Sequence, residues 1–439
     1  MKDITVREYA YLNVEYTNHP EDSLNSAYIS QSAFDAICDL SATFSKQGAK
    51  VFELAGRKRI KLDQYVGIIE TPCGTRIEIL PKHIVVAEDQ QIQDVIQKER
   101  RLLQAMLRTA LDLNHRKAGE ASLNKFVQPL HEWIIKQFLK CFESLVQRGL
   151  RFDYNRVQED QKFLRGQLQH ARYMRQPPSQ RHIFPIEHDV YEVNRPENRL
   201  IRTALEVVCK KTKDAANWKL AQELRLMTGG ILKSQNIQHD FRQWQSGRLL
   251  ALYEQIKPWT ELILGEYIPV STHGVARGMS LLFPMERLFE VYVGRKIQCL
   301  LLEWNVSLQK QDRYMCEQNG RSMFKLKPDI FMQHKHKYEQ NVKVVDTKWK
   351  LLDQLDRTAK FGIKDSDVQQ MFAYSAYYLG LEHEVVMIYP ARKDVFDQAL
   401  PVMKFKHGNS SLRVIPFDLD DSLKGEHFSF LEALVSKVS

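Results

Sequence analysis

The residue types that could do chemistry gather in the last third of the chain, at Asp329, Asp346 and Lys348. The apolar run over residues 342–345 predicts a buried β-strand that ends at the last two of these. Because successive side chains of a strand point to opposite faces, Asp346 and Lys348 share one face and Thr347 points to the other. One face of the predicted strand therefore carries a carboxylate and an ammonium.

Asp329, seventeen residues before Asp346, adds a second carboxylate. We expect it on a neighbouring strand over residues 327–332, which would bring the two acids together. Carboxylate oxygens are the hard ligands that Mg²⁺ prefers, and an ammonium beside them can orient an attacking water or neutralise charge on a phosphate. The pattern indicates a metal-dependent nuclease centre with Asp329 and Asp346 as metal ligands. The alternative is an ordinary ion pair between Asp346 and Lys348 at a strand end.

A comparison within the chain favours the nuclease interpretation. Among all lysines of the sequence, only Lys162 and Lys348 have an acid two residues before them. Lys162 ends a polar stretch over residues 156–162, which predicts no buried strand to hold the two side chains parallel. Lys348 alone follows a β-branched run.

A helix after the strand is expected to add polar side chains to the site. Ser366 and Gln369 have the spacing of a capping box, which predicts a helix that starts at Asp367. Gln370 and Tyr374 lie four residues apart and therefore share one face of that helix.

A second helix is predicted upstream, opening at Pro284, and it carries Glu286 and Glu290. Either glutamate could supply a further carboxylate to the site. A solvated helix face is the alternative for each of them.

The order of these motifs resembles the PD-(D/E)XK nuclease superfamily. The matching elements are a helix with Glu290, then Pro328-Asp329, then Asp346-Thr347-Lys348, and then a helix with Gln370 and Tyr374. The Gln-x-x-x-Tyr helix is typical of the RecB-like branch of that superfamily.

Other segments resemble McrC, the nuclease subunit of modification-dependent McrBC restriction systems. They are Tyr65-Val66-Gly67-Ile68-Ile69, Gly74-Thr75-Arg76-Ile77-Glu78-Ile79-Leu80-Pro81-Lys82, Arg148-Gly149-Leu150, Leu164-Arg165-Gly166 and Asn198-Arg199-Leu200-Ile201. The resemblance covers most of the chain in scattered motifs.

The resemblance implies a Mg²⁺-dependent endonuclease subunit that cleaves double-stranded, modified DNA. It also implies assembly with a hexameric AAA+ GTPase of the McrB type, whose GTP hydrolysis this chain stimulates. GTP would be bound by that partner, because the chain has no Gly-x-x-x-x-Gly-Lys-Ser/Thr motif. The implied roles are metal binding by Asp329 and Asp346, orientation of water by Lys348, assistance through a metal-bound water by Glu290, and shaping of the phosphate side by Gln370 and Tyr374.

Two other functions stay open at this point. One is a non-catalytic assembly factor that binds DNA and activates the GTPase, and the other is an autonomous repair nuclease. A degenerate site would have no reason to keep both carboxylates and the lysine, which favours an active enzyme.

The remaining pattern predicts a mixed α/β chain of three domains. Residues 1–90 alternate short β-rich segments with turns and predict a small α+β module, which the resemblance implies to be the GTPase-binding part. Residues 91–270 predict a mainly helical middle domain, with apolar positions at three- and four-residue spacing. Residues 271–439 predict a mixed sheet flanked by helices, entered through a linker at residues 271–278, and the resemblance implies that this is the PD-(D/E)XK nuclease domain.

Composition sets the wider bounds. The 439 residues include 63 Lys and Arg against 54 Asp and Glu, a net charge of +9 that agrees with binding to nucleic acid. No window approaches a membrane span and the N-terminus lacks a signal-peptide pattern, so we expect a cytoplasmic protein. The six cysteines form no Cys-x-x-Cys pair, which argues against a structural zinc site.

Overall fold

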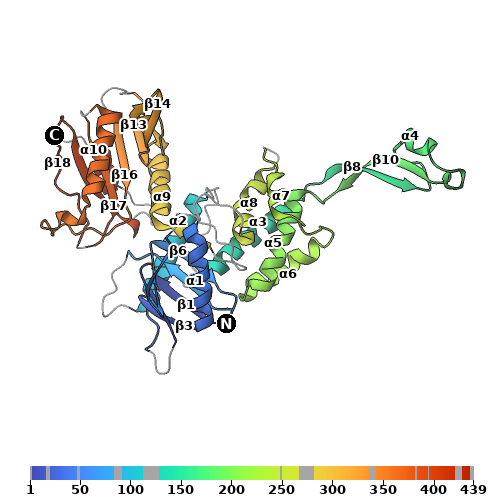
Figure 1. Ribbon diagram of the computed structural model, residues 1–439, viewed down its shortest axis with the longest axis horizontal. Coiled ribbons are helices and arrows are strands. Elements are labelled where there is room, and N and C mark those ends of the chain that lie inside the picture. Colours follow the sequence, from blue (N-terminus) through green and yellow to red (C-terminus); the bar gives the residue numbers. More distant parts are fainter. Residues whose placement is uncertain are drawn as a thin grey trace. The chain divides into compact units, whose positions relative to one another are not determined.

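The computed structural model describes residues 2–15, 20–46, 50–83, 91–111, 128–247, 250–265, 281–336, 342–380, 383–393, 395–420 and 428–435, and the linker expected at residues 271–278 lies outside these ranges. The chain divides into two compact units (Figure 1). The first unit consists of Met1–Leu130 and Pro269–Ser439, and the second consists of His131–Ile268.

Two four-stranded sheets form the N-terminal part of the first unit, with the strand orders β1-β7-β6-β11 and β3-β2-β5-β4. Their strands are β1 (Asp3–Arg7), β2 (Tyr11–Val14), β3 (Ser26–Ile29), β4 (Phe52–Gly56), β5 (Arg59–Leu62), β6 (Tyr65–Glu70), β7 (Arg76–Leu80) and β11 (Leu281–Pro284). Helix α1 (Gln31–Lys46) packs on them.

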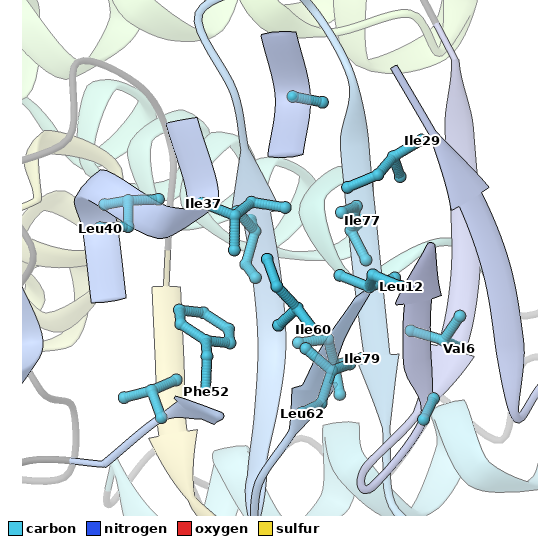
Figure 2. Close-up of a cluster of buried hydrophobic side chains, with 14 of the residues drawn as sticks. Val6, Leu12, Ile29, Ile37, Leu40, Phe52, Ile60, Leu62, Ile77 and Ile79 are labelled. Atoms are coloured by element: carbon cyan, nitrogen blue, oxygen red, sulfur yellow. The ribbon is translucent and has the colours of Figure 1, made fainter. Parts of the chain in front are cut away.

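A hydrophobic core joins the two sheets to α1. Figure 2 shows Ile37 and Leu40 of the helix with strand residues such as Leu12, Ile60 and Ile77. Each of these side chains is at most 7% exposed. Burial of this apolar surface stabilises the N-terminal part.

Strand β11 comes from the C-terminal half of the chain and pairs antiparallel with β6. The pairing requires a glycine at position 67, whose φ is +135° and where a Cβ would lie 2.0 Å from the carbonyl oxygen of Leu281. Helix α9 (Met285–Leu300) starts directly after β11, and α2 (Ile92–Ala110) packs on α9 and β7. These contacts tie the N-terminal and C-terminal parts into one unit.

The C-terminal part of the first unit is built on a six-stranded sheet of order β12-β15-β16-β17-β19-β18. Strands β16, β17 and β19 are mutually parallel, and the other neighbours are antiparallel. The elements of this part are β12 (Trp304–Leu308), the hairpin β13 (Arg313–Gln318) and β14 (Arg321–Leu326), β15 (Ile330–His334), β16 (Val342–Thr347), η3 (Lys360–Gly362), α10 (Asp365–Leu379), β17 (Val385–Pro390), β18 (Met403–Lys404), β19 (Ser411–Phe417) and α12 (Phe428–Val435).

Helices cover this sheet. Met371 and Tyr374 of α10 share a buried cluster with Val344 of β16 and Met387 of β17. Phe289 of α9 packs against other residues of the same part, as its ring contact with Phe417 shows. The expectation of a mixed α/β chain is confirmed.

The second unit combines helices with an antiparallel ribbon. Its helices are α3 (Leu130–Arg148), α4 (His170–Met174), η1 (Pro178–Gln180), α5 (Pro196–Lys211), α6 (Ala215–Met227), α7 (Ile237–Arg242) and α8 (Ala251–Leu264). Its strands β8 (Asp153–Gln161), β9 (Gln167–Leu168) and β10 (Phe184–Glu192) have the order β8-β10-β9. In Figure 1 the ribbon of β8 and β10 extends away from the helices of this unit.

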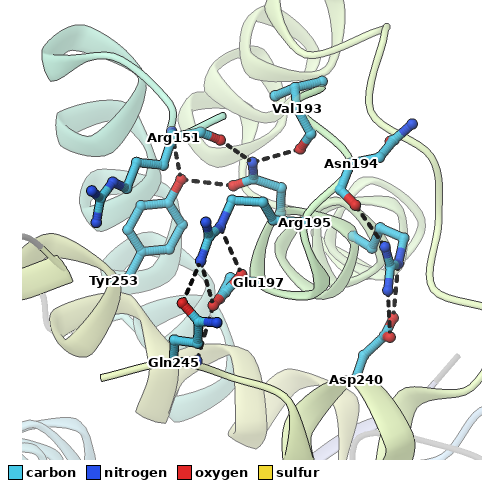
Figure 3. A network of polar contacts seen from close by, with 10 residues as sticks. Arg151, Val193, Asn194, Arg195, Glu197, Asp240, Gln245 and Tyr253 are labelled. Atoms are coloured by element: carbon cyan, nitrogen blue, oxygen red, sulfur yellow. Dashed lines mark hydrogen bonds and ion pairs between the residues drawn. The ribbon is translucent and has the colours of Figure 1, made fainter. Parts of the chain in front are cut away.

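A polar network fixes the ribbon at its base (Figure 3). The side-chain amide of Asn198 in α5 donates to the carbonyl oxygens of Arg151 and Val193, at 2.9 and 2.7 Å. These two residues flank the ends of β8 and β10. The Tyr253 hydroxyl donates to the Asn198 Oδ1 atom and accepts from the Arg151 amide, at 2.7 and 3.0 Å. Asn198 thus anchors both strands of the ribbon to α5 and α8.

Among the described residues, no helix is both long enough and apolar enough to cross a membrane.

Candidate active site

Asp346 and Lys348 lie at the carboxyl end of the central strand β16, as its alternation predicts. Asp346 is 1% exposed, and its Oδ2 atom lies 2.6 Å from the Lys348 Nζ atom. The Lys348 amide donates to the carbonyl oxygen of Ile388 in β17 at 2.9 Å, so the sheet also fixes the backbone that carries the amine.

Asp329 reaches the same place from the neighbouring strand. The expectation of a strand over residues 327–332 is wrong at its start, because β15 begins at Ile330 and Asp329 directly precedes it. Strands β15 and β16 are antiparallel, with Ile330 opposite Val345. One step further along this register, Asp329 comes beside Asp346.

Thr347 holds the Asp329 carboxylate in position. Its backbone amide and its hydroxyl both donate to the Oδ2 atom of Asp329, each at 2.8 Å. The sequence assigned Thr347 only to the opposite face of the strand and missed this role. The sequence signal for this role was a hydroxyl-bearing residue at the end of a predicted strand. Such residues are too common there to identify a site.

Glu290 lies on α9, and its carboxylate is held by two side chains that the sequence did not point to. The Arg287 Nη1 atom lies 2.8 Å from both carboxylate oxygens of Glu290. The Gln309 side chain donates to the Glu290 Oε1 atom at 2.7 Å. The i, i+3 spacing of Arg287 and Glu290 was readable from the sequence, whereas Gln309 becomes a neighbour only through the fold.

A chain of hydrogen bonds connects the lysine to α10. The Lys348 ammonium donates to Gln370 Oε1 at 3.1 Å, and Gln370 Nε2 donates to the Tyr374 hydroxyl at 2.7 Å. The Tyr374 hydroxyl in turn donates to the carbonyl oxygen of Lys327 at 2.9 Å, just before Asp329 in the chain. The polar pair on α10 therefore supports both the amine and the segment that leads to the acid.

The predicted capping box at the start of α10 is wrong. The helix begins at Asp365, its N-cap is Lys364, and no side chain caps it. Ser366 lies inside the first turn and is exposed, so it is not placed to cap. Asp367 has a different function in this turn, because its carboxylate pairs with Lys350 Nζ at 2.7 Å.

The carboxylates influence each other's protonation. Burial, followed by the charge of Asp329, raises the pKa of Glu290 to about 7 and that of Asp346 to about 7. Burial also raises the pKa of Asp329. For Lys348, burial favours the neutral amine, but the Asp346 and Asp329 charges outweigh it and raise the pKa. The acids repel one another even with the Lys348 ammonium and the Arg287 guanidinium nearby, so the site would be stabilised by additional positive charge.

The donor set fits a divalent cation of the Mg²⁺ type. Asp346 Oδ2 is buried and makes no hydrogen bond of good geometry, although the Lys348 ammonium lies close to it. Among the described residues, no three Asp, Glu, His or Cys side chains are already grouped as a complete metal site. Mg²⁺ keeps several waters and usually takes only one or two carboxylates from a protein. Asp329 and Asp346 therefore supply the number and the type of protein ligands that Mg²⁺ usually takes.

Comparison with known proteins agrees with this description. A family model described as McrBC 5-methylcytosine restriction system component matches residues 60–390, a range that contains all six candidate site residues. A search of curated proteins gives no match.

Two solved structures are similar to this chain. One is a chain in the refined half-complex from a tetradecameric assembly of Thermococcus gammatolerans McrB AAA+ hexamers with bound McrC, with a TM-score of 0.70 and 19% identity over 98% of this chain and 100% of that chain. The other belongs to the cryo-EM structure of the Thermococcus gammatolerans McrBC complex, with a TM-score of 0.50 and 22% identity over 67% of this chain and 87% of that chain. At these identities the likeness concerns the fold.

Proposed function

The chain belongs to the family of McrBC 5-methylcytosine restriction system components, and on that premise we propose that it is the Mg²⁺-dependent endonuclease subunit of such a system. It would hydrolyse phosphodiester bonds of double-stranded DNA that carries modified bases. The observation that supports this most is the meeting of Asp329, Asp346 and Lys348 at the end of β15 and β16.

The proposed roles follow from the contacts. Asp329 and Asp346 would hold Mg²⁺, which when bound neutralises charge on a phosphoryl oxygen and makes a water more acidic. Lys348 has its ammonium oriented by Gln370 and is placed to hydrogen bond an attacking water or a phosphate oxygen. Glu290, with a pKa raised to about 7, is suited to accept a hydrogen bond or a proton from a water at the site. Gln370 and Tyr374 keep the phosphate side of the site in shape.

The proposed architecture assigns these roles to parts of the chain. Residues 271–439 would be the endonuclease domain of the PD-(D/E)XK type, which its mixed sheet with the acids at the central strand ends supports. Residues 1–90 would bind the GTPase, and residues 91–270 would form the helical middle region, of which residues 91–130 belong to the first unit and residues 131–268 form the second. The long ribbon of β8 and β10 lies in that region.

The proposed partner is an McrB-like AAA+ GTPase hexamer. The sequence lacks a phosphate-binding loop motif of its own, so GTP would be bound and hydrolysed by the partner. The similar solved structures are of McrB AAA+ hexamers with bound McrC and of an McrBC complex, which supports the same kind of assembly here.

The test is a cleavage assay on methylated and unmethylated duplex DNA, in which the partner, GTP and Mg²⁺ are each left out in turn. We expect cleavage of the methylated duplex only when all three are present. Cleavage without the partner would instead indicate an autonomous nuclease. Stimulated GTP hydrolysis without any cleavage would indicate a non-catalytic assembly factor, and either result would refute the proposal.

A further inference from the structure

Trp349 follows the proposed catalytic lysine and is directed to the other side of the sheet. Lys348 contacts Gln370 of α10, whereas the ring of Trp349 packs on Phe289 of α9 at a centroid distance of 5.3 Å. Trp349 is 4% exposed. Because adjacent residues share a backbone, the position of the tryptophan restricts the position of the amine.

Two residues from the N-terminal part of the first unit hold Trp349. Its indole Nε1 atom donates to Glu8 Oε1 at 2.8 Å. Its carbonyl oxygen accepts from Gln64 Nε2 at 2.6 Å. Both hydrogen bonds join segments that are far apart in the sequence. One fixes the side chain of Trp349 and the other fixes its backbone.

Gln64 also sets the start of the helix that carries Glu290. Its carbonyl oxygen accepts from the amide of Met285, the first residue of α9, at 2.9 Å. The helix is further fixed because β11, which runs directly into it, is paired with β6. One residue of the N-terminal part therefore touches two of the segments that bring chemical groups to the site.

Glu8 is an unusual residue to find in this place without a function. It is 1% exposed and its Oε1 atom accepts from both the Trp349 indole and the Lys82 amide, at 2.8 Å each. Its Oε2 atom is buried and has no hydrogen-bond partner among the described residues. Leaving a buried polar atom unpaired costs free energy, so Glu8 bears this cost at Oε2 while its Oε1 atom accepts from Trp349 and Lys82.

We propose that Glu8 and Gln64 are positioning residues for DNA cleavage, acting through Trp349 on the Lys348 amine and, for Gln64, also on the start of α9. The inference rests on the proposed nuclease function. The N-terminal part would then help to position the catalytic groups, in addition to any contact that it makes with a partner. Removing either hydrogen bond would let residues 348–349 shift while the metal-binding acids stay in place.

The test compares cleavage by the assembled complex, with Glu8→Ala, Gln64→Ala and Trp349→Phe as single variants. We expect each to lower kcat about tenfold, about 1.4 kcal/mol of barrier, with the KM for DNA unchanged. Glu8→Gln keeps an oxygen acceptor for the indole and should restore most of the rate. The double variant Glu8→Ala/Trp349→Phe should be no slower than either single variant, because both remove the same hydrogen bond.

A matched control separates positioning from general loss of stability. Glu78 is also a buried glutamate of the N-terminal part, but it binds Arg100 and the Leu130 amide and does not contact Trp349. Glu78→Gln should lower the unfolding temperature and leave kcat of the folded complex unchanged. Gln64 is only partly buried, so its alanine variant remains informative if Glu8→Ala fails to fold.

Three outcomes would overturn the inference: wild-type kcat in Gln64→Ala, multiplied losses in the double variant, or the same loss of kcat in Glu78→Gln. These outcomes are distinct from failure of the proposed function. If wild-type protein in its complex shows no Mg²⁺-dependent cleavage, the nuclease assignment itself falls. If wild type cleaves and the positioning variants cleave equally well, only the inference about Glu8 and Gln64 falls.

Discussion

Replacing Glu8 by glutamine should stabilise the protein, and increasingly so as the pH rises. Burial, only partly offset by hydrogen bonds from Lys82 and Trp349, raises the pKa of Glu8 from 4.5 to about 7. Glu99 raises it further and His83 lowers it, and both residues are present in wild type and variant alike. An acid with a raised folded-state pKa costs no stability below its unfolded pKa, and the cost grows until the pH passes the folded value.

The size of the effect follows from those two pKa values. In wild type, ionised Glu8 destabilises the folded state by on the order of 1 kcal/mol near about pH 5.5 and on the order of 3 kcal/mol near about pH 8. Glutamine does not titrate. The free energy of unfolding of Glu8→Gln relative to wild type should therefore increase by on the order of 2 kcal/mol across this range.

The measurement is chemical denaturation of wild type and Glu8→Gln at both pH values, in the same buffer and at the same ionic strength. Groups that do not interact with Glu8 titrate alike in both proteins and cancel in the difference, whereas the interactions of Glu8 with Glu99 and His83 are part of the measured effect. A difference that stays constant with pH would mean that Glu8 is not buried in an environment that penalises its charge. A difference of opposite slope would mean that Glu8 is stabilised as an anion.

Three further predictions concern the site and its supports. Lys348→Met should lower Mg²⁺-dependent cleavage at least about 100-fold, as expected for loss of one transition-state contact. DNA binding, measured by fluorescence anisotropy, should persist. Unchanged cleavage would exclude a catalytic role for the amine. Gly67→Ala should destabilise the chain by about 2–4 kcal/mol in denaturant titrations, because its Cβ would meet the Leu281 carbonyl. The control Gly230→Ala has open space around it and should have little effect. Equal effects of the two substitutions would argue against the pairing of β6 with β11. Asn198→Ala should speed hydrogen exchange at the base of β8 and β10, since it removes the two donors that bind these strand ends; unchanged exchange there would show that Asn198 does not anchor the ribbon.

The sequence predicts the site best where local periodicity decides the geometry. Alternation along residues 342–348 is enough to place Asp346 and Lys348 together, and helical spacing is enough to place Gln370 beside Tyr374. These are short-range relations, and a strand or helix of any context would produce them.

Features that depend on long-range pairing were not predictable in this way. Asp329 comes beside Asp346 through the antiparallel register of β15 and β16, and no local pattern fixes that register. The bond from Trp349 to Glu8 joins residues 341 positions apart. The prediction of a capping box at Ser366 was wrong because α10 starts earlier, at Asp365. Asp367, in the first turn, pairs with Lys350.

The ribbon of β8 and β10 was missed for a different reason. Most of its side chains are exposed or only partly buried, so the strands lack the apolar alternation by which half-buried strands are recognised. Its pairing is supported instead by backbone hydrogen bonds and by the network at Asn198. Polar ribbons of this kind are weakly encoded in hydrophobic periodicity.

If the acids at the ends of β15 and β16 carry out cleavage, Asp346→Asn should abolish it without affecting assembly with the partner. The variant complex should be assayed for Mg²⁺-dependent cleavage of methylated duplex and, in the same preparation, for stimulation of the partner's GTP hydrolysis, beside Asp365→Asn as a control for an exposed acid that pairs with Lys360. We predict that Asp346→Asn loses cleavage at least about 100-fold and stimulates GTP hydrolysis as wild type does, while the control behaves as wild type in both assays. Cleavage by Asp346→Asn at the wild-type rate would show that Asp346 does not take part in the reaction.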